Sequence, residues 1–258
     1  MKRWRLLLAI GLGLGNLTWV SGVRGDGATA APATQPAGRQ PADVAAPKLG
    51  PDGQLDHHFK LKHEEFLQRR SQGKIGVLFL GDSITEGWNW WGKTVWPKYY
   101  PQLDAANFGI GGDQTQHVLW RIENGELDGI SPKVVVLLIG TNNIGYPADE
   151  ILKADEKIVQ EIREKLPQTK LLIMGIFPRA DKRAGSPPLM QAKIKKVNQG
   201  LATLDDGDKT RFLDIGEKFL DADGNIPREI MADSLHPTTK GYQIWADAMN
   251  PLLNEMLR

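Results

Sequence analysis

The sequence contains no cysteine among its 258 residues. Without cysteine there can be no disulfide bonds, no thiol catalysis and no lipoprotein-type anchor. The chain also lacks a marked excess of either charge, because 32 lysines and arginines stand against 31 aspartates and glutamates, a formal net charge of +1. This composition gives no indication of nucleic acid or of an anionic membrane surface as a partner.

Long hydrophobic runs are missing apart from residues 6–20, which follow a basic start at residues 2–5. This run is shorter than the roughly 20 apolar residues that a membrane-spanning helix needs, and glycines interrupt it. A basic start before a short apolar stretch is typical of a secretory signal peptide. We therefore predict that residues 1–25 are a signal peptide, that the protein is exported to the periplasm or the cell exterior, and that it has no stable membrane insertion after cleavage. An uncleaved membrane anchor is the alternative interpretation.

Large apolar side chains are scarce in residues 26–54, where alanine, proline and glycine dominate. Such a composition is typical of a flexible linker. Hydrophobic residues make up 41% of the whole chain, which is enough to bury one substantial core. We predict a single folded domain over residues 55–258, with no internal repeat.

Short apolar runs alternate with longer helical patterns from residue 55 onward. Runs that are almost wholly apolar are expected for strands buried on both faces of a sheet. Their regular alternation with helices predicts an α/β fold, with a parallel sheet covered by helices on both faces. The predicted strands are residues 76–80, 105–108, 134–139, 171–176 and 211–215. The predicted helices are residues 57–70, expected over the sheet edge, and residues 85–99, 114–124, 148–165, 188–204 and 238–257.

The apolar run at residues 77–80 is followed directly by the pentapeptide GDSIT (81–85). A serine in a tight turn behind a buried strand presents its hydroxyl at the carboxyl end of the sheet, where open α/β folds place their chemistry. That hydroxyl is a weak nucleophile until a base takes its proton. Ser83 is therefore the candidate nucleophile, and it requires a histidine paired with an acid.

Asp233 and His236 supply that pair in the segment DSLH (233–236). Side chains three residues apart in a helical turn lie on one face, so the Asp233 carboxylate can hold the His236 imidazole in its working tautomer. The other histidines are interpreted differently. A solvated helix face is predicted for His57, His58 and His63, and His117 is interpreted as a structural or rim residue.

Three hydrogen-bond donors are predicted to stabilise an oxyanion. The Ser83 backbone N–H begins the helix after the first strand. Gly112 belongs to the glycine-rich segment after the second strand, where the backbone can approach a ligand closely. Asn142 follows the third strand and offers a neutral amide. Because the carboxyl ends of parallel strands share one edge of the sheet, these groups can converge on one crevice.

The aromatic residues that follow Ser83 are divided between the core and the cleft. We predict that Trp91 and Trp96 pack their helix onto the sheet, whereas Trp88 and Trp90 either line the cleft or lie on the surface. Exposed tryptophan faces stack well on sugar rings and on lipids. The candidate substrate-binding residues are Ile84, Trp88, Trp90 and Thr141.

Two segments match known nucleotide- or calcium-binding motifs, but their surroundings in the sequence do not fit such sites. Residues 87–94 fit the phosphate-binding pattern G-x4-G-K-[ST], but they do not follow a strand directly and tryptophans crowd the loop. Residues 221–225 resemble part of a calcium loop, but the glycine is misplaced and Ala232 stands where a glutamate is required. We predict neither an organic cofactor nor a metal.

Four ordered blocks resemble the SGNH/GDSL hydrolase family: GDSIT (81–85), NFGIGGD (107–113), GTNN (140–143) and DSLH (233–236). Finer details in residues 107–127, 140–143 and 175–179 resemble the catalytic subunits of platelet-activating-factor acetylhydrolases. The resemblance implies a three-layer α/β/α sandwich of the flavodoxin-like type with a five-stranded parallel sheet. It also implies roles for five residues, as nucleophile, orienting acid, base and two oxyanion donors: Ser83, Asp233, His236, Gly112 and Asn142.

These observations predict a serine esterase that removes short acyl groups, acetyl first, through an acyl-enzyme. The preferred substrate is an acetylated carbohydrate, because export and an aromatic rim are expected. A small lipid or lysophospholipid ester is the alternative, supported by the closer resemblance. A non-catalytic glycan-binding protein and an acyltransferase of the same fold are rival functions, and a homodimer is compatible with the sequence.

Overall fold

Five parallel strands form one sheet in the order β2-β1-β3-β4-β5. The computed structural model describes residues 39–181 and 187–258, and the sheet belongs to the unit that begins at Gln40. The sheet confirms the predicted α/β fold. Its last strand ends earlier than predicted, because the Asp214 carboxylate turns back and accepts a hydrogen bond from the Gly216 N–H at 2.8 Å. The strands are β1 (Val77–Gly81), β2 (Ala105–Gly109), β3 (Val134–Leu138), β4 (Lys170–Met174) and β5 (Thr210–Leu213).

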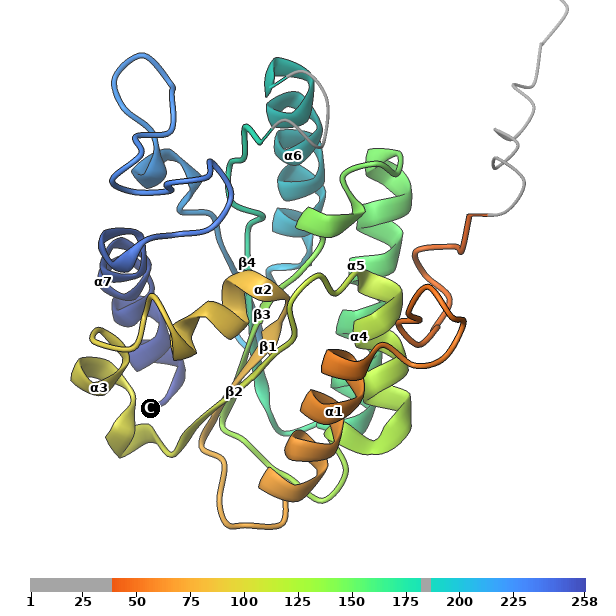
Figure 1. The fold of residues 1–258 in the computed structure, drawn as a ribbon. Coiled ribbons are helices and arrows are strands. Elements are labelled where there is room, and N and C mark those ends of the chain that lie inside the picture. Colours follow the sequence, from red (N-terminus) through yellow and green to blue (C-terminus); the bar gives the residue numbers. More distant parts are fainter. Residues whose placement is uncertain (1–38, 182–186) are drawn as a thin grey trace, which may run out of the picture. The chain divides into compact units, whose positions relative to one another are not determined.

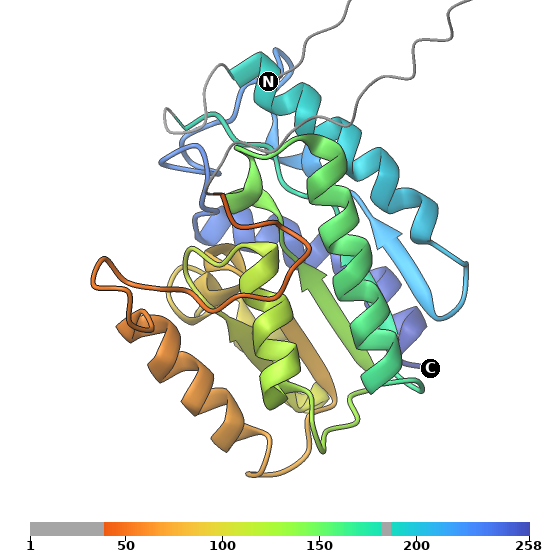
Figure 2. The same ribbon diagram turned by 90° about the vertical axis from the view of Figure 1, so that its right-hand side faces the viewer.

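Helices cover both faces of this sheet, as Figures 1 and 2 show. Along β1, Leu78 and Leu80 point into a core shared with four helices, whereas Val77 and Phe79 point into a core on the opposite face, where α7 lies. This alternation confirms the three-layer sandwich, because each strand contributes side chains to two separate cores. The helices of the first face are α1 (His57–Arg69), α4 (Thr115–Arg121), α5 (Ala148–Lys165) and α6 (Pro187–Leu201), and α7 spans Thr239–Met256.

The N-terminal helix α1 packs on the edge strand β2, as predicted, with the rings of Phe66 and Phe108 stacked at a centroid distance of 4.4 Å. No helix in the described part of the chain is long and apolar enough to cross a membrane. The predicted signal peptide and residues 26–38 of the predicted linker lie outside the described residues.

Two predicted helices are broken. The helix expected over residues 85–99 consists of a short α2 (Ser83–Glu86), a 3-10 turn and a short α3 (Trp96–Tyr99). Tyr242 of α7 packs so closely here that a Cβ on Gly87 would lie 2.1 Å from its hydroxyl oxygen. The helix expected over residues 114–124 ends at Arg121 and continues as a wide turn, in which Gly125 has a φ of 98°. Close packing and a left-handed glycine therefore override the helical pattern.

Within the predicted linker, residues 40–48 pack on the folded domain, which differs from the prediction. Ala42 is 1% exposed, and its carbonyl accepts a hydrogen bond from the Thr115 hydroxyl at 2.8 Å. The Ala46 N–H donates to the Gln116 carbonyl at 3.0 Å. Figure 2 shows this segment crossing α4. Small side chains and backbone hydrogen bonds hold it, so its lack of large apolar residues concealed the contact. We call residues 40–48 the N-terminal strap.

Candidate active site

The candidate nucleophile Ser83 begins α2 directly after β1, at the carboxyl end of the sheet. Asp82 caps this helix, since its carboxylate accepts a hydrogen bond from the Ile84 N–H at 2.9 Å. Gly81 is required here because a Cβ would lie 2.2 Å from the carbonyl oxygen of Leu138 on the neighbouring strand. The GDS sequence therefore folds into a turn that leaves the serine hydroxyl partly exposed.

Ser83, His236 and Asp233 form a continuous chain of hydrogen bonds. The Ser83 Oγ lies 2.9 Å from His236 Nε2, and His236 Nδ1 lies 2.7 Å from Asp233 Oδ2. The other Asp233 oxygen accepts hydrogen bonds from the backbone N–H groups of His236 and Leu235. Burial raises the pKa of the Asp233 carboxyl, but these hydrogen bonds outweigh burial and hold the pKa below its ordinary value. Asp233 is therefore an anion that orients the imidazole.

The turn that pairs Asp233 with His236 is not the helical turn predicted from their spacing. Ser234, between them, has a φ of 60° and lies in the left-handed region. Its carbonyl accepts a hydrogen bond from the Ala180 N–H at 2.9 Å. A left-handed residue reverses the chain locally, so the two side chains meet by a tight turn instead of by helical periodicity.

The loops after β2 and β3, which are predicted to supply the other two oxyanion donors, meet each other on the side of Ser83. Gly112 is exposed in a turn with a φ of 74°, a conformation that favours glycine. A Cβ on the preceding residue, Gly111, would lie 4.0 Å from the Ser83 Cβ. The Asn142 amide donates one hydrogen bond to the Asp113 carbonyl at 2.9 Å, which leaves its second N–H for another acceptor. The sequence-predicted groups are thus neighbours in space.

A buried cluster of charges holds these loops from behind. Arg121 is completely buried and donates hydrogen bonds to the carbonyls of Gly81 and Phe108, where β1 and β2 end. Its guanidinium also lies 3.1 Å from the Asp113 carboxylate and 3.0 Å from the Glu126 carboxylate. One cation therefore connects the two strand ends that carry the serine and the glycine-rich turn.

The sequence did not reveal this buried cluster, and the predicted surroundings of His63 on α1 are wrong. His63, predicted on a solvated face, is 9% exposed, and its Nδ1 lies 2.8 Å from Glu126 Oε1. His58 is exposed, as predicted, and its Nε2 lies 2.9 Å from the buried Glu86. The one available signal was Arg121 itself, a basic residue among apolar helix neighbours. His117 is structural, as interpreted, because its Nδ1 accepts a hydrogen bond within its own helix start.

The buried carboxyl of Asp113 is expected to make stability fall as pH rises. Burial is the main cause that raises its pKa to about 8, although the charges of Arg121 and Lys48 oppose the shift. Between about pH 4 and pH 8 the unfolded chain loses this proton and the folded chain keeps it, so unfolding is favoured by up to about 1.4 kcal/mol per pH unit. The other groups that act on this carboxyl are Glu126 and Asp82.

Urea unfolding at pH 5, 6, 7 and 8 should therefore show Asp113→Asn gaining stability relative to the wild type as pH rises. The asparagine keeps the shape and has no proton to lose. Asp208→Asn, at an exposed position, is the control, and its stability should change with pH in the same way as that of the wild type. A constant difference between Asp113→Asn and the wild type across this range would contradict the prediction.

The structure contradicts a surface role for three of the four predicted substrate-binding side chains. Ile84 and Trp88 are each 1% exposed and pack in the core beside α7. Thr141 is 3% exposed, and both its carbonyl and its hydroxyl accept hydrogen bonds from Arg179. Trp90 alone of the four is exposed, at 51%. The broken helix after Ser83 turns Trp88 inward, which its position next to the nucleophile did not indicate.

Trp91, predicted to pack in the core, lies instead at the candidate site. It is 47% exposed, and its ring stacks on that of His236 with centroids 5.6 Å apart and planes 29° apart. The Thr239 hydroxyl donates to the Trp91 carbonyl at 2.8 Å and holds this segment to the start of α7. Trp91 is therefore an aromatic surface beside the histidine.

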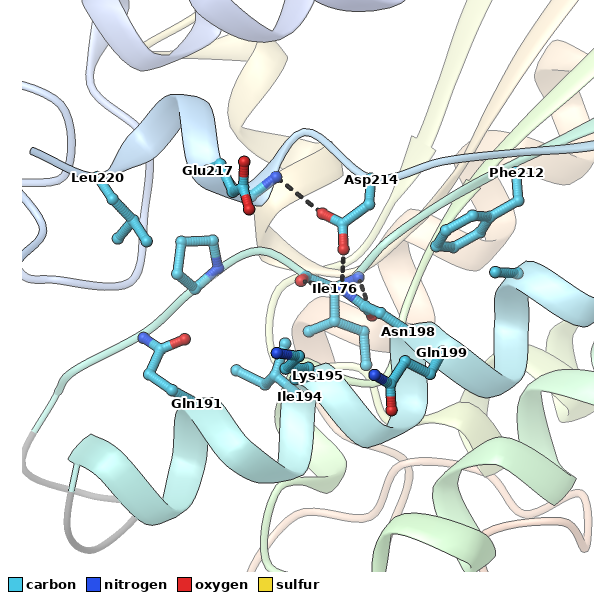
Figure 3. A pocket seen from close by; sticks show the side chains of 13 residues that line it. Ile176, Gln191, Ile194, Lys195, Asn198, Gln199, Phe212, Asp214, Glu217 and Leu220 are labelled. Atoms are coloured by element: carbon cyan, nitrogen blue, oxygen red, sulfur yellow. Dashed lines mark hydrogen bonds between the residues drawn. The ribbon is translucent and has the colours of Figure 1, made fainter. Parts of the chain in front are cut away.

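A pocket of about 400 Å³ lies outside this site, between α6 and the turn after β5 (Figure 3). Two of its polar side chains bind each other, since the Asp214 carboxylate accepts a hydrogen bond from the Asn198 amide at 2.8 Å, and the same carboxylate accepts one from the Gly216 N–H at 2.8 Å. The pocket has no residue in common with the Ser83–His236–Asp233 chain. Within residues 39–181 and 187–258 there is also no group of three or more acidic, histidine or cysteine side chains suited to a metal ion.

Known proteins are similar to this chain in sequence and in fold. Residues 79–244 match the GDSL-like lipase/acylhydrolase family. The chain is 37% identical over 215 residues to rat platelet-activating factor acetylhydrolase IB subunit alpha2, covering 83% of this chain and 91% of that protein. It is 36% identical over 207 residues to the human subunit alpha1, covering 80% and 87%.

Two solved structures extend the comparison of folds. A GDSL-like lipase from Bacteroides thetaiotaomicron superimposes with a TM-score of 0.60 at 18% identity, covering 75% of this chain and 97% of that one. An acetyl xylan esterase from Geobacillus stearothermophilus gives a TM-score of 0.51 at 21% identity, covering 71% and 97%. These two likenesses concern the fold, which agrees with the family match. The chain therefore belongs to the GDSL-like lipase/acylhydrolase family and is a carboxylic ester hydrolase.

Proposed function

We propose that the enzyme is a serine esterase that removes short acyl groups, acetyl first, through an acyl-enzyme on Ser83. The observation that carries the proposal is the hydrogen-bond chain from Ser83 Oγ to His236, at 2.9 Å, and on to Asp233, at 2.7 Å. Nucleophile, base and orienting acid in this order are the arrangement that activates a serine hydroxyl.

In the proposed reaction, Ser83 Oγ attacks the ester carbonyl carbon while His236 Nε2 takes the hydroxyl proton. Asp233 stabilises the imidazolium that forms. The N–H groups of Ser83, Gly112 and the Asn142 amide stabilise the negative charge on the carbonyl oxygen. The tetrahedral intermediate then expels the alcohol, which receives its proton from His236, and a water molecule repeats the sequence on the acyl-enzyme to release the acid.

Acetyl is the proposed acyl group because the relatives at 36–37% identity are acetylhydrolase subunits. The proposed alcohol part is a carbohydrate. This choice is supported by the exposed indole faces of Trp90 and of Trp91, which lies against His236. A sugar ring can stack on such a face while its acetyl ester reaches the serine. Export and a homodimer are not required by this chemistry and stay predictions from the sequence.

A lipid ester is the second candidate, because those same relatives are named for platelet-activating factor. The two candidates differ in the alcohol part, so acetate release from acetylated xylan and from a short-chain acetylated phospholipid separates them. We expect faster release from xylan at equal acetyl concentration. Faster release from the phospholipid would favour the lipid alternative, and acetyl transfer to an added sugar would indicate an acyltransferase.

Removing the Asn142 amide is expected to lower kcat for p-nitrophenyl acetate by about 100-fold, the usual effect of losing one oxyanion donor. KM should change little, because the donor binds the tetrahedral intermediate more strongly than the substrate. Steady-state kinetics of Asn142→Ala test this. Asn124→Ala, in the turn after α4, is the matched control, since this exposed amide donates to the Trp120 carbonyl. Loss confined to KM would contradict the assigned role.

A further inference from the structure

Lys48, at the end of the N-terminal strap, reaches into the turn that carries Gly112. Its ammonium donates a hydrogen bond to the Gly111 carbonyl at 2.5 Å. A Cβ on Gly112 would lie only 2.9 Å from the same nitrogen. The backbone of Lys48 is fixed in turn, because its carbonyl accepts a hydrogen bond from the Asp56 N–H at 2.9 Å. A residue predicted to lie in a linker is therefore a neighbour of the candidate oxyanion turn.

The Gly111 carbonyl and the Gly112 N–H belong to one peptide group. In a planar trans peptide these two bonds point in opposite directions. An ammonium that holds the carbonyl on one side therefore fixes the direction of the N–H on the other side. The contact also polarises the peptide group, because hydrogen bonds to a charged partner are stronger and reinforce the next bond in the chain. Lys48 thus orients and polarises the Gly112 N–H, the group that is proposed to donate to the oxyanion.

The neighbouring peptide of this turn is held as well. The Gly111 N–H donates to Glu86 Oε2 at 2.7 Å, and the other Glu86 oxygen lies 2.9 Å from His58 Nε2. Gly111 is consequently held through its N–H by a carboxylate and through its carbonyl by an ammonium. Glycine residues have no side chain to restrict their backbone, so these two contacts set the shape of the turn.

Within the part of the chain that the structure describes, no acidic side chain contacts the Lys48 ammonium. Lys48 takes part in none of the ion pairs found within the described residues. Its field reaches nearby groups: burial is the main cause that lowers the pKa of His117 to about 4, and the charge of Lys48 is the next. A positive charge with no acid in contact favours negative charge at the adjacent site.

We infer that Lys48 is a positioning residue for catalysis, which holds and polarises the peptide group whose N–H, at Gly112, stabilises the oxyanion. The inference rests on the proposed function, because it needs an oxyanion at that position. Lys48 acts through the peptide and takes no proton. It makes the N-terminal strap part of the catalytic unit.

The test compares Lys48→Met, which keeps the length of the side chain and removes its charge, with Lys48→Arg, which restores a donor and a charge. With p-nitrophenyl acetate, Lys48→Met should lower kcat about tenfold, or about 1.4 kcal/mol, and leave KM nearly unchanged. Lys48→Arg should recover most of that loss. A merely structural role would not be rescued by charge and would not spare KM.

Two control variants separate the ammonium from the strap and from lysine loss in general. Lys153→Met removes the contact of 2.6 Å with Asp43, which anchors the strap elsewhere, and keeps Lys48. Lys60→Met removes an exposed lysine of α1. Both should retain the wild-type kcat, and all variants should unfold at the wild-type temperature. A loss in Lys153→Met equal to that in Lys48→Met would overturn the inference, since docking of the strap would then explain both.

Ser83→Ala distinguishes failure of this inference from failure of the proposed function. If Ser83→Ala is inactive and Lys48→Met keeps the wild-type kcat, the role of Lys48 is wrong and the serine mechanism stands. If Ser83→Ala keeps activity, the serine mechanism and the inference fall together. A change in KM alone in Lys48→Met would also overturn the inference, because it would indicate a contact with the substrate.

Discussion

Ser83→Ala is expected to lower kcat for p-nitrophenyl acetate by about a million-fold, the largest effect predicted for any single change in this enzyme. His236 would then have no hydroxyl to deprotonate, and no acyl-enzyme could form. The oxyanion donors would be intact, so hydrolysis by water should stay above the uncatalysed rate. The thermal unfolding temperature should hardly move, because the hydroxyl is partly exposed and makes one side-chain hydrogen bond.

Two measurements check this expectation. Steady-state kinetics give the loss in kcat, with Ser71→Ala as the control for removing a hydroxyl from an exposed turn. Mass spectrometry after reaction with a serine-directed phosphonate should show one adduct on the wild type and none on Ser83→Ala. Wild-type turnover by a pure preparation of Ser83→Ala would show that the nucleophile is another group.

The main features of the fold, and the hydrogen-bond chain of the candidate site, could be predicted because they depend on local sequence. A wholly apolar strand ending in GDS places Ser83, and an acid three residues before a histidine identifies Asp233 and His236. Parallel strands then bring Gly112 and Asn142 to the same edge of the sheet. These inferences use order along the chain and the period of the strands, which the sequence carries directly.

The features that escaped prediction depend on packing between distant segments. Trp88 and Trp91 are close in sequence and chemically alike, yet Trp88 is buried against the Tyr242 ring of α7, with centroids 4.6 Å apart, and Trp91 is exposed. The N-terminal strap is held by hydrogen bonds to backbone groups, which composition does not reveal. Arg121 resembles an ordinary basic residue near a helix end until the strand carbonyls that it binds are known.

Arg121→Met should lower the free energy of unfolding by about 3–5 kcal/mol, because removing one member of a buried ionic cluster leaves the other charges without compensation. The Glu126 carboxylate would lose the guanidinium 3.0 Å away, and the Asp113 carboxyl would lose the positive charge that opposes the rise of its pKa. The carbonyls of Gly81 and Phe108 would lose a buried donor. Urea unfolding followed by tryptophan fluorescence measures the change, and Arg69→Met, whose guanidinium binds exposed loop carbonyls, is the control.

A second substitution can show whether Arg121→Met destabilises the protein through uncompensated charge or through lost packing, because only the first cause is relieved when a neighbouring carboxylate is removed. Adding Glu126→Gln to Arg121→Met removes one uncompensated carboxylate and should restore part of the stability, although Glu126→Gln alone is destabilising. Such a coupling would show that uncompensated charge causes the loss of stability in Arg121→Met. If the two losses simply add, or if Arg121→Met unfolds at the urea concentration of the wild type, the guanidinium is not what holds the ends of β1 and β2 together. If the two substitutions are coupled in this way, the folded fraction of Arg121→Met should also have a lower kcat, because those strand ends carry Ser83 and the turn of Gly112.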